Sequence, residues 1–232
     1  MRAVVNVSMG GHYSRLHDRM SSAFLQQGEA NIISWKDSLP SASPSHDDVP
    51  YAFKLHAMEA AVRQGYSTVL WVDSSIIPVK SLKPLWDLIE SQGYWFSANL
   101  PYGSTTKPRW TCGEWTCDAA LAPLGITREE AFQIPLVIAT SFGLDIRHQI
   151  AQTFLAEWGK LVRGRTAMLG PWTNQGFRAS QDERVLGHRH DQTVASVVAH
   201  RLGMKLTVPP KWIVDGLPVV ESTVLEIKRS LV

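Results

Sequence analysis

The chain has 232 residues, 44% of them hydrophobic and 19% charged, which is ordinary globular composition and enough for one large α/β domain. Its formal net charge of +2 gives no electrostatic case for a nucleic-acid partner or an anionic membrane. The two cysteines, Cys112 and Cys117, are too few for a disulfide scaffold and are expected to be unlinked thiols. The N-terminal apolar run is too short for a signal peptide, and no window approaches a transmembrane segment, so we expect a cytoplasmic protein.

Short β-branched runs alternate with helical spacing in the first third of the chain. Residues 2–7 and 31–35 predict strands, and 68–72 (Thr-Val-Leu-Trp-Val) predicts a fully buried strand. Helices are expected over 16–27 and 51–64, each ended by a glycine. Residues 8–14 are expected to form a turn-rich loop. This alternation predicts an α/β fold with a mostly parallel central sheet flanked by helices.

The remaining chain continues with less regular spacing. Thr127 and Glu130 have the spacing of a capping box and predict a short helix. Long irregular loops are expected over 100–117 and 164–180. Further elements are predicted as follows: helices over 81–92, 145–162 and 187–202, and strands over 94–98, 135–144 and 204–208. No element is predicted after 208.

A carboxylate and two hydroxyls, Asp73-Ser74-Ser75, follow the buried strand 68–72. In an open α/β sheet, ligands bind beyond the carboxyl ends of the strands. Asp73 is therefore a candidate ligand for a divalent cation bound to a diphosphate, or for the ribose of a nucleotide. The alternative is a turn acid that caps nearby backbone N–H groups.

A second group of polar side chains, His188-Arg189-His190-Asp191-Gln192, stands where the helix over 187–202 begins. A helix start favours anions, and Arg189 can pair bidentately with phosphate oxygens. An imidazole can bind a metal or a leaving phosphate, and Asp191 can orient a sugar hydroxyl or act as a base. The alternative is a solvated helix start with charged flanks.

Two weaker signals have open interpretations. Lys54 lies in the first turn of its helix, where the helix dipole disfavours a cation, so it is either paired with a phosphate or simply solvated. Trp110, Trp115 and Trp172 lie in expected loops. Aromatic side chains there can stack on sugar faces or only pack against the protein.

Two stretches of the sequence resemble the GT-A-fold glycosyltransferases that use nucleotide-diphosphate sugars. Tyr51-Ala52-Phe53-Lys54 followed by residues 65–75 resembles the lysine-bearing helix and "vlWlDsD" strand of these enzymes. Residues 188–193 resemble the "HRHDQ" segment of small bacterial and viral members. Order and spacing agree over residues 2–208. The resemblance implies one GT-A domain over 1–232, with a nucleotide-binding part over about 1–100 and an acceptor-side part over about 101–232.

The resemblance also implies a role for individual residues. Asp73 matches the first acid of the D-x-D motif, whereas Ser75 stands where the main metal-binding acid usually is. Asp191 matches the acid that faces donor and acceptor, so Asp191 and Asp73 are the expected catalytic residues. The residues implied to hold the nucleotide and its diphosphate are Asn6, Ser8, Tyr13, Arg15, Lys54, Asp73, Ser74 and Arg189. The residues implied to bind a divalent cation, Mn²⁺ or Mg²⁺, are Asp73, Ser75 and His190.

The departure at Ser75 leaves the metal requirement open, because a hydroxyl is a far weaker ligand than a carboxylate. Metal-independent transfer, with Lys54 and Arg189 neutralising the diphosphate, is the alternative. The expected activity is sugar transfer from a nucleotide-diphosphate sugar, UDP-sugar favoured, to a hydroxyl of a carbohydrate or glycoconjugate acceptor. Two other functions stay open: a catalytically weak nucleotide-sugar-binding module, and a sugar-phosphate nucleotidyltransferase. The latter needs a basic Gly-rich loop, and here Gly10 and Gly11 have only Arg15 nearby.

Overall fold

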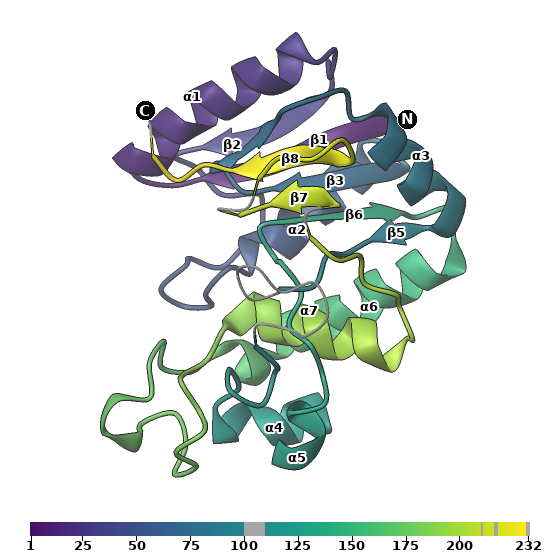
Figure 1. Ribbon diagram of the computed structural model, residues 1–232. Coiled ribbons are helices and arrows are strands. Elements are labelled where there is room, and N and C mark those ends of the chain that lie inside the picture. Colours follow the sequence, from purple (N-terminus) through teal and green to yellow (C-terminus); the bar gives the residue numbers. More distant parts are fainter. Residues whose placement is uncertain (100–109, 210, 216–217, 231–232) are drawn as a thin grey trace.

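The computed structural model describes residues 1–99, 110–209, 211–215 and 218–230 (Figure 1). Within these residues the main sheet has the order β2-β1-β3-β6-β5. Its strands are β1 (Arg2–Ser8), β2 (Ile32–Lys36), β3 (Thr68–Val72), β5 (Tyr94–Trp95) and β6 (Ser141–Asp145). β1 pairs in parallel with β2 and β3, while β6 pairs antiparallel with β3 and β5. Among the described strands of this sheet, only β6 is antiparallel to the others, and the predicted mostly parallel sheet is confirmed.

The alternation of side chains along β1 and β3 gives the sheet two buried faces. Val5 and Trp71 pack in a cluster with α2 (Phe53–Arg63) and α6 (Gln149–Gly164). Val4 and Leu70 pack in a second cluster with α1 (Gly11–Gln26) and α3 (Lys83–Gln92). Every residue of β3 is buried, as its β-branched and apolar sequence predicts.

Gly143 in β6 shows how closely a helix approaches this sheet. A Cβ atom at this position would lie 2.3 Å from Cδ1 of Ile89 in α3. Only a glycine leaves room for that side chain, so the sequence of β6 is fitted to the helix that covers it.

The C-terminal segment returns to the sheet and adds a small second one. Among the described residues, β8 (Thr223–Ile227) lies between β4 (Ile76–Pro78) and β7 (Trp212–Val214), antiparallel to β4 and parallel to β7. These strands lie over one face of the main sheet, where their apolar side chains join the cluster of Val4 and Leu70 (Figure 1). The Arg19 side chain of α1 donates hydrogen bonds to the carbonyls of Lys228 and Ser230. The end of the described chain is thereby attached to α1.

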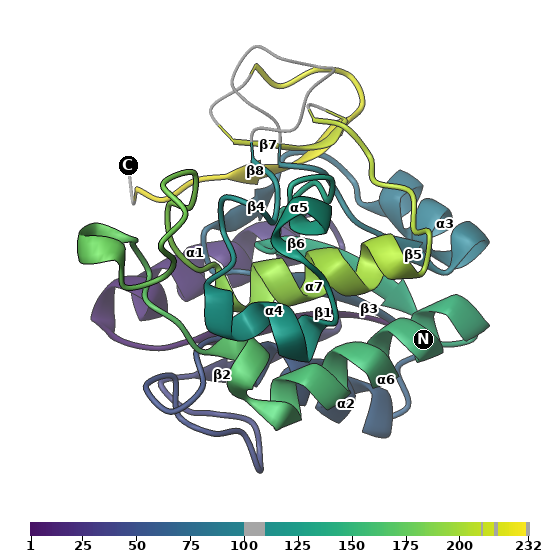
Figure 2. The same cartoon turned by 90° about the horizontal axis from the view of Figure 1, so that it is seen from below.

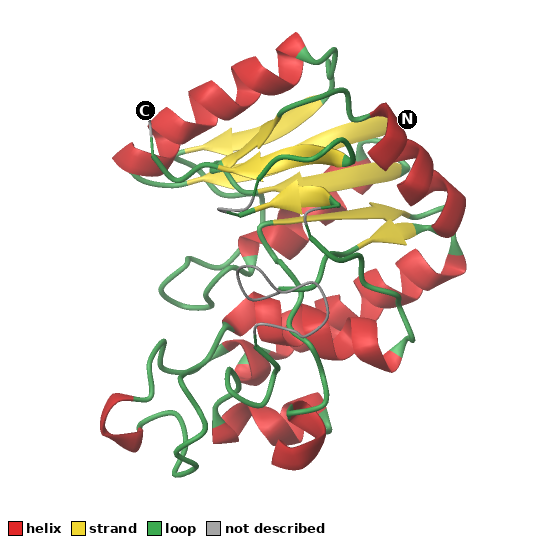
Figure 3. Cartoon of the chain, in the orientation of Figure 1, coloured by secondary structure: helices red, strands yellow, loops and turns green. Residues whose placement is uncertain are grey.

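A third layer is built by α7 (His190–Arg201), whose residues 190–191 and 193–199 are buried. Viewed from below, α7 crosses the molecule beside its neighbour α6 (Figure 2). The short helices α4 (Asp118–Leu124) and α5 (Arg128–Ala131) lie next to it, and the capping box of Thr127 and Glu130 is confirmed. The loop-rich segment 165–189 projects from this side of the molecule, with two 3₁₀ turns, Thr166–Met168 and Gln175–Phe177 (Figure 3).

Several predicted bounds were wrong. The predicted strand over 204–208 is not formed, because only Thr207 bridges to Ser97 beyond the two-residue strand β5, which offers little edge for pairing. The first helix begins at Gly11, within the predicted loop 8–14, and the helix predicted over 145–162 begins at Gln149. Of the predicted strand over 135–144, only its end falls in β6.

Other elements were not predicted at all: α4, β4, β7 and β8. Of the predicted loop over 100–117, residues 100–109 lie outside the described residues. No helix in the described part of the chain is long and apolar enough to cross a membrane.

Candidate active site

A cavity of about 450 Å³ opens where β3 ends. Its wall is assembled from α2, the turn after β3, residues 138–140, the start of α7 and the C-terminal segment. The charged residues that line it are Lys54, Asp73, Arg189, Asp191, Asp215 and Arg229. The planar uncharged side chains that line it are Tyr51, Asn99, Trp110, Trp172 and Gln192. We call this cavity the cleft.

Lys54 joins the two predicted catalytic carboxylates. Its Nζ lies 3.2 Å from Oδ1 of Asp73 and 2.9 Å from Oδ2 of Asp191. It also donates to the carbonyl of Ala139 at 2.8 Å. An ammonium group has three N–H donors, and these three acceptors match them. The Lys54 side chain is only 3% exposed, so it is a buried bridge between α2, the end of β3 and the start of α7.

The charges in this cluster support one another. Burial by itself would lower the pKa of Lys54, but Asp191 and Asp73 raise that pKa above the ordinary lysine value, so Lys54 stays charged. Burial raises the pKa of Asp73, and the charge of Lys54 opposes this rise. Burial and the negative charge of Asp191 raise the pKa of Tyr51 to about 12. The tyrosine is therefore neutral at physiological pH and presents an uncharged ring and hydroxyl.

The turn after β3 fixes the direction of Asp73. Its backbone N–H donates to the carbonyl of Thr140, and its carbonyl accepts from Ile76, which closes the turn Asp73-Ser74-Ser75-Ile76. The indole N–H of Trp71 donates to Oδ1 of Asp73 at 2.8 Å. In the described structure the partners of this carboxylate are side chains of Trp71 and Lys54 and not backbone N–H groups. The interpretation of Asp73 as a turn cap is therefore wrong.

Arg189 presents a positive charge to the cleft. Its guanidinium group lies between two indole rings, 3.6 Å from the centroid of Trp115 and 4.1 Å from that of Trp172. One of its N–H groups donates to the carbonyl of Trp172 at 3.2 Å. Burial lowers the pKa of Arg189, and no acidic side chain of the described chain pairs with it. The stacking holds the guanidinium plane in place and leaves other donors for an anionic ligand.

The two histidines beside Arg189 have structural partners. The ring of His188 accepts from the backbone N–H of Cys117 and donates to the carbonyl of Ala167, and burial lowers its pKa to about 3. The Nδ1–H of His190 donates to the carbonyl of Met168 at 2.8 Å, and its ring stacks on Trp172. Burial also lowers the pKa of His190. Neither histidine is among the residues that line the cleft.

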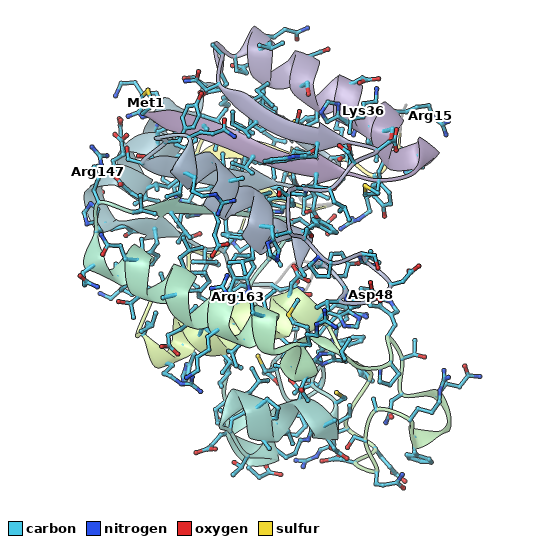
Figure 4. All side chains as sticks on the ribbon, turned by 180° about the vertical axis from the view of Figure 1, so that it is seen from behind. Met1, Arg15, Lys36, Asp48, Arg147 and Arg163 are labelled. Carbon is cyan, nitrogen blue, oxygen red and sulfur yellow. The ribbon has the colours of Figure 1, made fainter. Side chains whose placement is uncertain are left out.

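The residues expected to hold the nucleotide are only partly brought together. Lys54, Asp73 and Arg189 line the cleft. Asn6 is fully buried, and its Nδ2 donates to the carbonyl of Val72 and to Oγ of Ser74, so these side chains join the ends of β1 and β3. The other residues expected to hold the nucleotide, which do not line the cleft, are Ser8, Tyr13, Arg15 and Ser74. Ser75, predicted as a metal ligand, does not line it either. Tyr13 is exposed, and Figure 4 shows Arg15 pointing outward near Lys36.

The start of α1 is already occupied by a carboxylate of the chain. Oδ1 of Asp37 accepts from the backbone N–H of Gly10 at 3.0 Å and from the hydroxyl of Ser14 at 2.6 Å. These hydrogen bonds, that of Ser14 first, lower the pKa of Asp37. A phosphate held by the Gly10-Gly11 loop would have to displace this carboxylate.

The predicted divalent cation can be tested against these residues. In the described residues, no group of three histidine, cysteine or acidic side chains is placed to hold a metal ion. A cation such as Mg²⁺ needs only one or two carboxylates when phosphates and water complete its shell. The Asp73 side chain lines the cleft and is 29% exposed, so it fits a cation shared with a bound diphosphate. Metal binding by Ser75 and His190 stays a prediction.

The sequence patterns did not indicate the amide Asn99 or the charged residues Asp215 and Arg229 as parts of the cleft. Asp215 and Arg229 lie in the segment for which no element was predicted. Their side chains form a bidentate ion pair at 2.6 and 2.9 Å. No local pattern marks these positions, since each is brought to the cleft only by the pairing of β7, β8 and β4.

Comparison with known proteins gives a likeness of fold. No family model matches the sequence, and no curated protein matches it. A glycosyltransferase involved in glycosylation of the major capsid of PBCV-1 superposes with a TM-score of 0.51 at 14% identity, covering 97% of this chain and 92% of that one. The bifunctional glycosyltransferase WbbM, in its apo structure, superposes with a TM-score of 0.52 at 10% identity. This match covers 97% of this chain and 45% of the WbbM chain.

Both structural similarities cover almost the whole of this chain. This chain spans less than half of the WbbM chain. At such identities they concern the fold alone. The predicted α/β, GT-A-like fold class is confirmed.

Proposed function

We propose that the protein is a glycosyltransferase that moves a sugar from a nucleotide-diphosphate sugar to a hydroxyl of a carbohydrate or glycoconjugate acceptor. The observation that carries this proposal is the Lys54 bridge, which places Asp73 and Asp191 side by side in one cleft at the end of β3. The fold that the chain shares with two glycosyltransferases supports it.

The side chains of the cleft suit a sugar. Rings of Tyr51, Trp110 and Trp172 offer apolar faces for stacking on a sugar ring. Asn99 and Gln192 stand among carboxylates and guanidinium groups, and all of these are planar groups that hydrogen-bond hydroxyls. Apolar walls with a few convergent polar groups are typical of small-ligand sites.

The proposed reaction is mainly electrostatic. When the bond between sugar and diphosphate breaks, negative charge grows on the phosphate and positive charge on the anomeric carbon. Arg189 neutralises the phosphate charge, and Asp73 orients the donor through its ribose or its diphosphate. The acceptor oxygen bonds to the anomeric carbon, Asp191 accepts the proton of that hydroxyl, and Lys54 holds the carboxylate of Asp191 in position.

We keep a divalent cation, Mn²⁺ or Mg²⁺, in the proposal, with Asp73 as its protein ligand. When bound, such an ion would supply positive charge to the leaving diphosphate.

UDP is the proposed nucleotide. Cys112 and Cys117 are free thiols, which supports a reducing, cytoplasmic setting. The carboxylate of Asp37 at the start of α1 is the observation that speaks against a nucleotidyltransferase.

Calorimetric titration with UDP, GDP and dTDP, each with and without Mn²⁺, tests the donor site. We expect one nucleotide to bind, and Asp73→Asn to weaken that binding, because Asp73 is the acid that meets the donor. The matched control is Asp47→Asn, an exposed acid in the loop before α2. Binding without sugar transfer or donor hydrolysis would leave a binding module, and no binding of any nucleotide would overturn the proposal.

A further inference from the structure

The C-terminal segment brings a second cation to the rim of the cleft. Arg229 Nη1 and Nη2 lie 2.6 and 2.9 Å from the two carboxylate oxygens of Asp215. Both residues line the cleft together with Asp73. The negative charge of Asp73 contributes, after the hydrogen bonds to Asp215, to raising the pKa of Arg229, so the guanidinium group lies within electrostatic reach of the donor-side acid.

This ion pair is exposed, unlike that of Lys54. The Arg229 side chain is 63% exposed and that of Asp215 is 40% exposed. Exposed pairs contribute little to stability because water solvates both partners. A guanidinium group binds a phosphate with the same bidentate geometry as a carboxylate. Arg229 can therefore exchange Asp215 for a phosphate at low cost.

The backbone beside Arg229 is fixed although its side chain is exposed. The N–H of Lys228 donates to the carbonyl of Ser75 at 2.7 Å, and Ile227 pairs with Ile76 in the small sheet. Arg19 donates to the carbonyl of Lys228 from the other side at 2.5 Å. Arg229 thus starts from a point anchored to the Asp73-Ser74-Ser75 turn, and a change of partner needs only rotation of its side chain.

The charges of the cleft give a reason for that change. The cations Lys54, Arg189 and Arg229 are matched by the acids Asp73, Asp191 and Asp215. A diphosphate adds negative charge to this balanced set. Lys54 is buried and cannot turn toward the ligand without leaving the buried Asp191 and the partly exposed Asp73 without their shared ion-pair partner. When Arg229 turns from Asp215 to the diphosphate, its guanidinium charge meets the ligand, and the exposed carboxylate of Asp215 is solvated by water.

We propose that Arg229 is a further diphosphate-binding residue, that Asp215 holds it at the rim of the free cleft, and that the donor diphosphate takes the place of Asp215. This inference rests on the proposed function and names a residue of the same donor site. In this proposal Asp215 competes with the diphosphate for Arg229. Removal of the negative charge of Asp215 therefore strengthens the binding of the diphosphate to Arg229.

The test is a set of calorimetric titrations with the nucleoside diphosphate that the wild-type chain binds, starting with UDP. Asp215→Asn is expected to bind it about threefold more tightly, and Arg229→Gln about tenfold more weakly. Arg229→Lys, which keeps the charge but loses the bidentate geometry, is expected to fall between wild type and Arg229→Gln. In the double variant that also carries Arg229→Gln, Asp215→Asn is expected not to tighten binding of the nucleoside diphosphate. The matching nucleoside without phosphate, uridine for UDP, is expected to bind all variants equally.

Asp182→Asn is the matched control, because Asp182 pairs with Arg184 on the surface and does not line the cleft. If Asp215→Asn tightens binding equally in the presence and absence of Arg229, the substitution acts only by removing a negative charge near the ligand. The proposed exchange of Asp215 for the diphosphate is then overturned. Weaker binding by Asp215→Asn would show a purely structural pair and would overturn it as well. If the wild type binds no nucleoside diphosphate, the proposed function fails together with this inference. If it binds one but the variants do not differ, this inference alone fails.

Discussion

Lys54 and Arg229 are both cations paired with carboxylates along one cleft, yet their surroundings differ. The Lys54 side chain is 3% exposed and bridges two acids and a carbonyl, whereas that of Arg229 is 63% exposed and has, among the described residues, an ion pair with Asp215. A buried charge is costly to leave without its partner, while an exposed pair exchanges its partner for water or a ligand at little cost. The buried bridge therefore fixes the positions of Asp73 and Asp191, the proposed catalytic acids, and the exposed pair is the part of the cleft that we propose responds to a ligand.

The comparison is tested most strongly by removing the buried cation. Lys54→Met leaves Asp73 and Asp191 without their shared partner, and we expect it to lower the free energy of unfolding by about 3–5 kcal/mol. Denaturant unfolding at several pH values measures this loss. Burial raises the pKa of Asp73 in the folded state, and loss of Lys54 removes the charge that opposes this rise. An acid whose pKa is raised on folding stabilises the fold at low pH, so the loss is expected to shrink as the pH falls. A loss below about 1 kcal/mol at neutral pH would contradict the buried bridge.

The next effect is on catalysis. Asp191→Asn keeps the shape of the side chain but removes the proposed base, and we expect turnover to fall about 100-fold or more with the fold retained. Asp47→Asn makes the same change on an exposed loop and is expected to leave turnover unchanged. Steady-state rates with saturating donor and acceptor measure both. Full turnover by purified Asp191→Asn would remove this residue from the proposed mechanism.

A third prediction concerns burial without an ionic partner. His188 has its pKa lowered by burial to about 3 from the ordinary value of 6.5. Between these values the unfolded chain binds a proton that the folded chain does not, so the free energy of unfolding falls as the pH is lowered from 6.5 toward 3. His188→Gln is expected to flatten this slope by up to about 1.4 kcal/mol per pH unit. His200→Gln, a change at an exposed position of α7, serves as the control.

The smallest effect is expected at the exposed pair. Asp215→Asn is expected to change the free energy of unfolding by less than about 1 kcal/mol, because both side chains are solvated with or without the pair. Thermal and denaturant unfolding of the free protein measure it. A loss as large as that of Lys54→Met would show that Asp215 holds the small C-terminal sheet together, and the contrast between the two pairs would disappear.

Sequence patterns predicted the parts of the site that depend on neighbours along the chain. The strand over 68–72 matches β3 in both bounds, since its β-branched and apolar residues suit a position buried on both faces. Asp73 follows from that strand. The start of α7 was recognised from its polar residues, but the sequence did not show that His188 hydrogen-bonds backbone groups with both ring nitrogens, or that Nδ1–H of His190, a predicted metal ligand, donates to Met168. An imidazole in a sequence does not reveal whether its nitrogens are already used.

What the sequence by itself determined is the direction of the first strands and the placing of Asp73 at their carboxyl edge, because periodicity and turn residues act over a few positions. Only the tertiary structure decided that Lys54 stands between Asp73 and Asp191, which come from three separate elements. It also decided that Asp215 and Arg229 reach the cleft, and that Asp37 occupies the start of α1. These arrangements depend on contacts between residues far apart in the chain, and on charges that pair only after the sheets have formed.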